Sequence, residues 1–494
     1  MDPQPRPIAI PDLPRLREDP QGPAARRRRR WRGQVLNASP ATLGTSGDTS
    51  LWRGDLRPLT IGIVSLITLM AFEGIGSATA MPVVARELNA LSAYTWSFNA
   101  FIVATLLGMV LGGSWSDSSG PRGPLVSGVV TFTVGAIVAG AAMNLGVLVI
   151  GRALQGLGAG VVIVGAYVLI ARAYSESQRP KAFSILAASW VVPALIGPVL
   201  AGWLADNVSW RAVFWLVPLF VIPPCLLLFP RMSPYQGGTP QEFARRRLMA
   251  GGLATAGLLA LQDGVLRLSV PGAVEAIVGL VVVVGAARYL LPVGALRFRR
   301  GLPTSVMMRG LIAAAYFGAE VFVPLALIEI RGLSTTEAGL VLAAAALFWS
   351  LGSYLQARLP GDLDRSQAVR LGAAIVGVSV LTLPLSLLEG LPPYLAIASW
   401  ALGAFGMGLA IPSVSVQVMR LSPPEDQGVN SASIQIVDSV LSVVAVAVLG
   451  IVHAAAVASG GATVSTYVAL WGGAALFAAF AIVVAGRMRP SLSS

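Results

Sequence analysis

The chain alternates between long apolar stretches and short breaks that contain glycine, proline or charged residues. A stretch of about 20 apolar residues is long enough to cross a bilayer as a helix. We predict fourteen such helices, so the expected fold is an all-α integral membrane protein. They cover residues 59–82, 94–116, 123–144, 146–170, 182–205 and 210–230, then 248–266 and 273–292, then 306–329, 336–357, 368–388, 393–417, 429–456 and 465–486.

The composition supports a membrane protein. Hydrophobic residues make up 55% of the chain and charged residues only 12%, whereas soluble domains carry about 25% charged residues. The chain has one cysteine, Cys225, which excludes an intramolecular disulfide.

The distribution of positive charge predicts the orientation of the helices. The net charge is +12. If the N-terminus is cytoplasmic, the outer side receives only Arg86, Arg211, Arg267 and Arg331, as the positive-inside rule requires. One missed helix would destroy this bias. We therefore expect a multi-pass protein of the inner (plasma) membrane with both termini in the cytoplasm.

The spacing of the helices predicts four segments. Residues 1–54 read as a disordered basic cytoplasmic tail, residues 55–232 as a six-helix bundle, residues 233–305 as cytoplasmic loops with a two-helix insert, and residues 306–490 as a second six-helix bundle. The tail contains the run Arg26–Arg30. We interpret this run as a topology signal that also contacts anionic lipid. An RNA-binding segment is less favoured, because no aromatic or fold-level feature accompanies the run.

Two glutamates interrupt apolar helices at matching positions. Glu73 and Glu320 each follow the start of a predicted span by about 14 residues, or about 21 Å. Burial in a low dielectric disfavours a charged carboxylate, so such a group can exchange a proton near neutral pH. A cationic substrate would favour the ionised form and expel the proton. The alternative is a permanently protonated acid that is hydrogen-bonded within the bundle.

Two further acids lie within predicted helices. Asp438, a candidate proton-coupling residue, stands in the cytoplasmic third of its helix and forms either a polar helix contact or part of the pathway. Gln435, which lies beside it, is a candidate residue of the substrate cavity. Asp263 precedes Arg267 by four residues, which favours an ion pair near the outer surface.

The loop between the second and third predicted helices reads GSWSDSSGPRG and contains Gly113, Asp117, Gly120 and Arg122. A glycine permits a tight left-handed turn, and an acid can accept hydrogen bonds at a helix N-terminus. The loop either forms part of a gate or only caps two helices.

Two neighbouring helices carry polar or helix-bending residues. The fourth reads LVIGRALQGLGAG, in which Arg152 and Gln155 are expected to face the interior, because arginine is disfavoured toward lipid. There they would balance the acids or support a substrate cavity. The fifth reads SWVVPALIGPVLAG and is either a pivot or a structural kink. Its motif residues are Pro193, Gly197, Pro198 and Gly202.

These three stretches, in this order, resemble the signature motifs of the major facilitator superfamily. The segment SWRAVFWLVP, residues 209–218, is similar to the opening of helix 6 in its fourteen-helix drug:proton antiporter branch. The resemblance covers about residues 55–490. It implies two six-helix repeats, alternating access, a gating motif at Asp117 and an antiporter motif on the fifth helix. Glu73 stands where the branch commonly has aspartate, and Ser118 and Pro121 replace basic residues of the loop motif.

We therefore predict a proton-coupled efflux transporter for multiple amphiphilic compounds, acting as a monomer without cofactor or metal. The alternatives are an exporter of one endogenous metabolite or lipid, and a non-transporting scaffold or sensor. No enzyme is expected. The single histidine, His453, lies near the outer end of its helix, where an interfacial position is expected, and the sequence has no nucleotide-binding loop.

Topology reporters test the fourteen-helix count. Fusions after Pro234 and after Gly301 should both report a cytoplasmic position, and a fusion near Pro271 should report the outer side, because residues 248–292 are expected to cross twice. A cytoplasmic signal near Pro271 would contradict the count.

Overall fold

The computed structural model describes residues 51, 52, 54, 56–235, 245–359, 364–423 and 426–489. The run Arg26–Arg30 and nearly all of the expected tail lie outside the described residues. The same holds for part of the loop that precedes the insert.

The described part of the chain is helical and contains no strand. Fourteen stretches are long and apolar enough to cross a membrane, which confirms the predicted spans. The helices are α2 (Leu56–Glu87), α3 (Trp96–Ser119), α4 (Arg122–Gly140), α5 (Leu145–Ala173), α6 (Arg179–Ala188), α7 (Val191–Asn207), α8 (Arg211–Leu228), α9 (Arg245–Leu266), α10 (Val270–Leu290), α11 (Leu302–Glu320), α12 (Phe322–Arg331), α13 (Thr335–Ala357), α14 (Arg365–Thr382), α15 (Leu395–Leu421), α16 (Gln427–Ala458) and α17 (Val464–Val484).

Two spans are interrupted, each shortly before a proline. The break between α6 and α7 precedes Pro193, which has no N–H to offer to the carbonyl of Ser189. That carbonyl accepts a hydrogen bond from Thr68 Oγ1 of α2 at 3.2 Å instead. The fifth predicted helix is thus bent, as expected. The break between α11 and α12 precedes Pro324 and was not predicted, because the sequence suggested one continuous span over 306–329.

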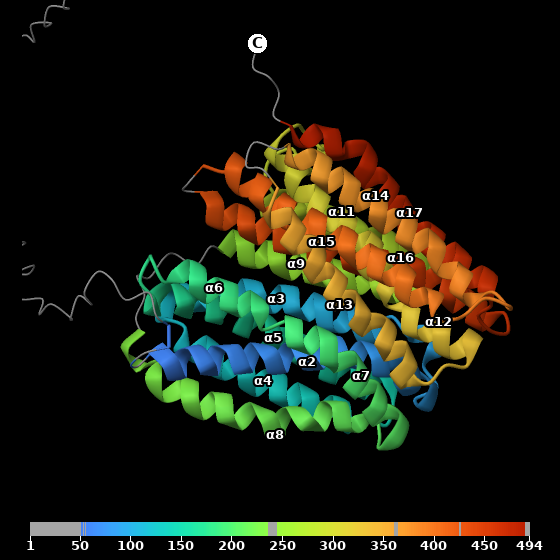
Figure 1. Cartoon of the computed structure of the whole chain (residues 1–494), viewed down its shortest axis with the longest axis horizontal. Helices are drawn as coiled ribbons and strands as arrows, with labels where there is room; N and C mark the ends of the chain where they lie inside the picture. Colours follow the sequence, from blue (N-terminus) through green and yellow to red (C-terminus); the bar gives the residue numbers. More distant parts are fainter. Residues whose placement is uncertain are drawn as a thin grey trace, which may run out of the picture. The chain divides into compact units, whose positions relative to one another are not determined.

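The helices form two groups in Figure 1. The first helix group contains α2–α8 and the second contains α11–α17. The insert helix α9 packs against α3 of the first group and α16 of the second. Its Ala254 and Leu258 share one buried apolar cluster with Leu106 and Val443.

A buried amide cluster joins the insert to both groups. Gln262 of α9 donates a hydrogen bond from Nε2 to Thr95 Oγ1 at 2.8 Å. Its Oε1 accepts one from Asn99 Nδ2, which also lies 3.4 Å from the carbonyl of Val443 in α16. The side chains of Thr95, Asn99 and Gln262 are buried. A polar group inside a membrane bundle needs such partners, so this cluster holds α9 at a defined depth.

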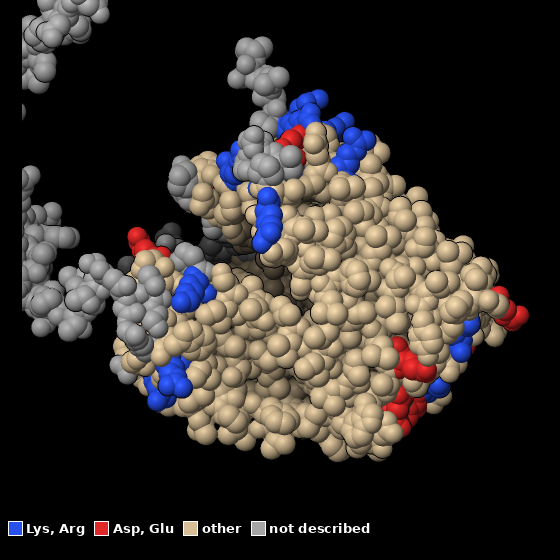
Figure 2. All heavy atoms as spheres, viewed as in Figure 1, with Lys and Arg blue, Asp and Glu red and all other residues tan. Residues whose placement is uncertain are grey.

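The two groups meet at one end of the bundle. We call the end at which α2 begins, with Leu56, the proximal face, and the end at which α2 finishes, with Glu87, the distal face. At the distal side, Tyr94 donates a hydrogen bond to the carbonyl of Val321 at 2.9 Å, and Arg86 forms a 2.6 Å ion pair with Glu329. Figure 2 shows the surface hollowed between the groups on the opposite, left-hand side.

Small residues allow this distal contact. A Cβ on Gly339 of α13 would lie 2.4 Å from the carbonyl oxygen of Pro198 in α7. A Cβ on Gly202 would lie 2.6 Å from the carbonyl oxygen of Thr335. The carboxylate of Asp206 also accepts hydrogen bonds from the backbone N–H groups of Thr335 at 3.1 Å and Thr336 at 2.8 Å. The distal contact therefore depends on backbone approaching backbone.

Added side-chain volume should open the distal contact. Gly202→Ala and Gly339→Ala should each destabilise it by about 1–3 kcal/mol through overpacking. Ala338, next to Gly339, is 0% exposed. A cysteine introduced there by Ala338→Cys, in a Cys225→Ser background, becomes accessible only when the distal contact opens. Maleimide should label it about tenfold faster in either alanine variant, which corresponds to about 1.4 kcal/mol.

Gly252→Ala provides the matched control, since nothing lies within 4 Å of its added Cβ. If maleimide labels both test variants at the same rate as this control, the proposed role of the backbone contact is contradicted.

Candidate functional site

Two charged side chains in the interior of the first helix group form an ion pair. Arg152 Nη1 of α5 donates to Glu73 Oε1 of α2 at 2.7 Å, and the two side chains are 4% and 0% exposed. Arg152 also donates from Nε to the carbonyl of Ser97 at 3.1 Å, and its guanidinium lies 4.5 Å from the centre of the Phe101 ring. The structure thus places Arg152 in the interior, beside the acid that the sequence singled out.

Glycines in α5 bring the neighbouring helices close enough for this pair. A Cβ on Gly156 would lie 2.1 Å from the carbonyl oxygen of Phe101 in α3, and one on Gly151 would lie 2.5 Å from the backbone nitrogen of Ala139 in α4. The motif GRALQGLGAG therefore packs α5 against both helices while its arginine reaches toward α2.

Part of the hydrogen-bonding capacity around the pair is unused. Gln155 Oε1 accepts from Arg152 Nη1 at 3.2 Å. Within the described part of the chain, neither Glu73 Oε2 nor Gln155 Nε2 has a hydrogen-bond partner. A buried carboxylate oxygen without a donor is a favourable place for a proton, because protonation removes the cost of the unsatisfied charge.

Glu320 occupies a corresponding position but has different surroundings. It is the nineteenth residue of α11, and Glu73 is the eighteenth of α2. Both helices begin earlier than predicted, so both acids lie about 26 Å along their helices rather than about 21 Å. Glu320 is partly exposed, and no hydrogen bond or ion pair to its carboxylate is found among the described residues. Glu320 therefore matches Glu73 in depth but has no counterpart of Arg152 in the described part of the chain.

The second helix group has its own ion pair. Arg309 of α11 donates to Asp438 Oδ2 of α16 from Nη2 at 2.8 Å and from Nε at 3.1 Å, and the two side chains are 16% and 17% exposed. Asp438 thus makes a polar contact between α11 and α16, and its part in the pathway stays a prediction. Gln435 is exposed. The sequence-based interpretation missed Arg309, although an arginine within a predicted apolar helix was a detectable signal.

The loop motif between α3 and α4 has the predicted turn. Gly120 takes a φ of 91°, a conformation that favours glycine, and α4 begins at Arg122. Asp117 and Arg122 are exposed, and Gly113 is partly buried. No described residue bonds to the carboxylate of Asp117, while Arg122 lies 3.5 Å from Ser233 Oγ. The acid therefore does not bond to a helix N-terminus in the described structure.

The proline–glycine motif of the fifth span lies at the contact between groups. Pro193, Gly197, Pro198 and Gly202 are all buried. A Cβ on Gly76 of α2 would meet the Gly197 carbonyl oxygen at 3.2 Å. The motif thus lets α7 pack closely against α2 as well as α13.

Asp263 of α9 and His453 of α16 both lie near the distal face. The expected ion pair between Asp263 and Arg267 is present, and Arg267 also contacts Glu275 at 3.3 Å. His453, expected at the membrane interface, is 3% exposed and packs against the rings of Tyr94 and Phe322. The distal contact between the groups thus covers this histidine, and its position at the membrane interface stays a prediction.

Known proteins identify the class to which this chain is similar. It is 25% identical to the multidrug transporter protein MdtP of Bacillus subtilis (strain 168) over 407 residues, which cover 80% of this chain and 74% of MdtP. It is 24% identical to the multidrug efflux pump SdrM of Staphylococcus aureus (strain N315) over 334 residues, covering 65% of this chain and 73% of SdrM. An uncharacterised MFS-type transporter of Mycobacterium tuberculosis (strain ATCC 25618 / H37Rv) is 26% identical over 419 residues, which span 80% of this chain but only 60% of that protein.

The fold matches solved transporters. The crystal structure of a POT family transporter in complex with 5-aminolevulinic acid aligns with a TM-score of 0.65 and 15% identity, covering 87% of this chain and 96% of the other. At this identity the match shows the fold alone. The family model of the Major Facilitator Superfamily matches residues 61–446. The protein is therefore a multi-pass membrane transporter and not an enzyme, and it belongs to the Major Facilitator Superfamily, whose fourteen-helix branch its fourteen candidate spans fit.

Proposed function

We propose that this transporter exports amphiphilic compounds in exchange for protons. The observation that carries the proposal is the buried Glu73–Arg152 pair, in which Glu73 Oε2 has no partner among the described residues. Multidrug transport by the relatives MdtP and SdrM supports the choice of substrate class. For a neutral substrate, one proton that moves inward through a membrane potential of about 100 mV supplies about 2.3 kcal/mol, which is sufficient to drive moderate accumulation.

The pair suggests how proton binding and substrate binding compete. Protonation of Glu73 at Oε2 removes its charge and weakens its attraction to Arg152. A cationic amphiphile near the site favours the ionised carboxylate and so releases the proton. Gln155, which accepts a hydrogen bond from Arg152 at 3.2 Å, would stabilise the guanidinium while the acid changes charge.

Glu320 and Asp438 are the other candidate proton carriers. Glu320 has no charge partner among the described residues, so its protonation breaks no ion pair. Asp438 retains an oxygen, Oδ1, without a partner in the described part of the chain, while Oδ2 accepts from Arg309. We place Gln435 of α16, which is exposed, at the substrate cavity.

We further propose that the proximal face is cytoplasmic and that both chain ends lie there, in the inner membrane. Lysine and arginine gather on the left and upper parts of the surface in Figure 2, as the positive-inside rule predicts for a cytoplasmic side. The described structure is then open toward the cytoplasm. Asp117 and Arg122 would close that side in the opposite state, when the motif at Pro198 and Gly202 separates from α13. The two six-helix bundles would rock as units of a monomer.

A second candidate is export of one metabolite. The chain is 31% identical over 158 residues to the acurin A biosynthesis cluster MFS-type transporter of Aspergillus aculeatus (strain ATCC 16872 / CBS 172.66 / WB 5094), covering 32% of this chain and 28% of that protein. Resistance of a bacterial host to several unrelated compounds, rather than to one, separates the multidrug function from this candidate.

Variants of the ion pair test its role in coupling. Glu73→Gln leaves Arg152 buried without a counter-charge, so the protein should lose about 3–5 kcal/mol of stability. The double variant Glu73→Gln/Arg152→Gln removes both charges and should recover most of this stability. Neither should release protons when tetraphenylphosphonium, a cationic amphiphile, is added. Thermal unfolding and a pH-sensitive dye measure the two properties on purified protein.

The outcome of the double variant decides between two roles of the pair. If it is stable and releases protons as the wild type does, the pair is only structural. If it is stable, still binds the probe and releases none, the pair is required for proton coupling.

Glu320→Gln tests the second acid. Since no ion pair is lost, its stability should remain within about 0.5 kcal/mol of the wild type. The number of protons released per bound tetraphenylphosphonium should fall if Glu320 carries a proton. Glu389→Gln, at an exposed glutamate, is the matched control. Unchanged proton release in Glu320→Gln would restrict coupling to Glu73 and Asp438.

A further inference from the structure

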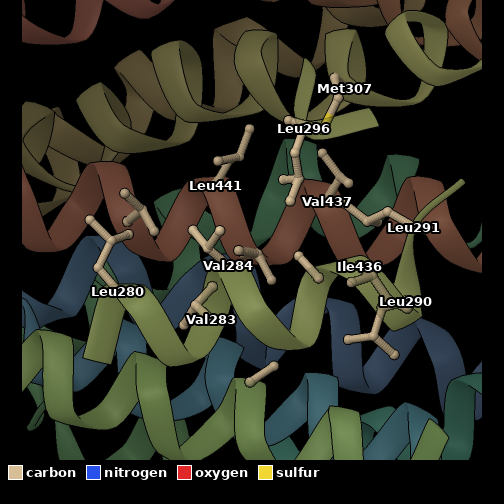
Figure 3. Close-up of a pocket in the computed structure, with 14 residues that line it drawn as sticks. Leu280, Val283, Val284, Leu290, Leu291, Leu296, Met307, Ile436, Val437 and Leu441 are labelled. Atoms are coloured by element: carbon tan, nitrogen blue, oxygen red, sulfur yellow. The ribbon is translucent and has the colours of Figure 1, made fainter. Parts of the chain in front are cut away.

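An apolar groove runs between the insert and the second helix group. Figure 3 shows its lining, which includes Leu280, Val284 and Leu291 on the insert side, Val437 and Leu441 of α16, and Met307 of α11. The groove has a volume of about 110 Å³, and all of its lining residues are apolar. Leu280 and Val284 are 42% and 39% exposed, so the groove opens toward the outside of the bundle.

The groove has the length of one membrane leaflet. Its lining extends from Leu280, near the middle of α10, to Leu291, directly after the proximal end of this helix. Eleven residues of helix rise about 16 Å, about half of the 30 Å hydrocarbon core. A chain in the groove would therefore extend from the proximal surface to the middle of the bilayer.

Positive charge surrounds the proximal end of the groove. Arg288 stands one helical turn beyond the lining residue Val284, and Arg297 directly follows the lining residue Leu296. Arg299 and Arg300 follow in the same segment, and all four arginines are exposed. Among the residues that the structure describes, none of the four guanidinium groups has a hydrogen bond or ion pair. An acidic group from outside the chain would complement them.

We propose that the groove is a binding site for an anionic glycerophospholipid of the leaflet at the proximal face. One acyl chain lies between α10 and α16, and the phosphate contacts Arg288 and Arg297. A cationic amphiphile fits the groove less well, because the arginines repel it. A zwitterionic lipid brings an ammonium group to the same arginines. The site is independent of the proposed export function, since its residues take no part in the ion pairs described above.

Native mass spectrometry of the delipidated full chain tests the proposal. Phosphatidylglycerol and phosphatidylcholine with identical acyl chains are added at equal concentration, and the fraction of protein that retains one lipid is measured. Wild type should prefer phosphatidylglycerol. An arginine near an anionic lipid contributes about fivefold in affinity, so Arg288→Gln/Arg297→Gln should reduce this preference by about twenty-fold. Arg231→Gln/Arg358→Gln, at two other exposed arginines, changes the net charge equally and should leave the preference intact.

A second variant tests the apolar part of the site. Ala287→Phe fills the groove at a lining position and leaves the arginines in place, so binding of both lipids at this site should fall at least about fivefold. Val281→Phe, at a position that is 65% exposed and outside the lining, is its control. Three results would overturn the proposal: equal retention of the two lipids by wild type, unchanged preference in Arg288→Gln/Arg297→Gln, or competition by glycerol 3-phosphate as strong as that by the lipid.

Discussion

An isolated charge in the middle of a membrane protein is too costly to leave without a partner, and the arrangement of α2 and α5 follows from this constraint. Glu73 and Arg152 are 0% and 4% exposed and lie 2.7 Å apart. Losing either partner would leave the other buried and uncompensated, at a cost of about 3–5 kcal/mol. The pair therefore fixes the rotation and depth of α2 relative to α5. The second helix group meets the same constraint with Arg309 and Asp438, at a more exposed site.

At both helix breaks a backbone carbonyl accepts a hydrogen bond from a side chain of another helix or segment. A proline leaves a carbonyl without its N–H partner, and membrane surroundings require another donor. At Ser189 that donor is Thr68 of α2. By the same rule Pro324 frees the carbonyl of Glu320, and the carbonyl of the next residue, Val321, accepts a hydrogen bond from Tyr94 of the first group. Irregular backbone thus provides a contact between helices, within the first group at Ser189 and between the two groups at Val321.

The fourteen spans could be predicted because hydrophobicity is a property of each stretch alone. The interior position of Arg152 followed from the same argument, because lipid excludes an arginine. The partner of Asp438 did not follow, since Arg309 is 129 positions away in sequence and only packing of α11 against α16 joins them. Glu320 shows the limit of reasoning from repeats. It matches Glu73 in depth, yet the sequence contains no rule that gives it an arginine.

The insert links the two helix groups through buried hydrogen bonds, and these bonds restrict how the groups can move apart. Gln262 of α9 bonds to Thr95 and Asn99 in the first group, and Asn99 also reaches the carbonyl of Val443 in the second. These groups are buried, so separating them in the membrane without new partners costs about 1–3 kcal/mol for each unsatisfied group. The apolar groove between α10 and α16 borders the same insert, and Ala254 of α9 belongs to its lining. A movement of the second group away from α3 must therefore break the contact of Asn99 with Val443 if the insert stays with the first group, or both hydrogen bonds of Gln262 if the insert moves with the second. A lipid held by both α10 and α16 would favour the second course.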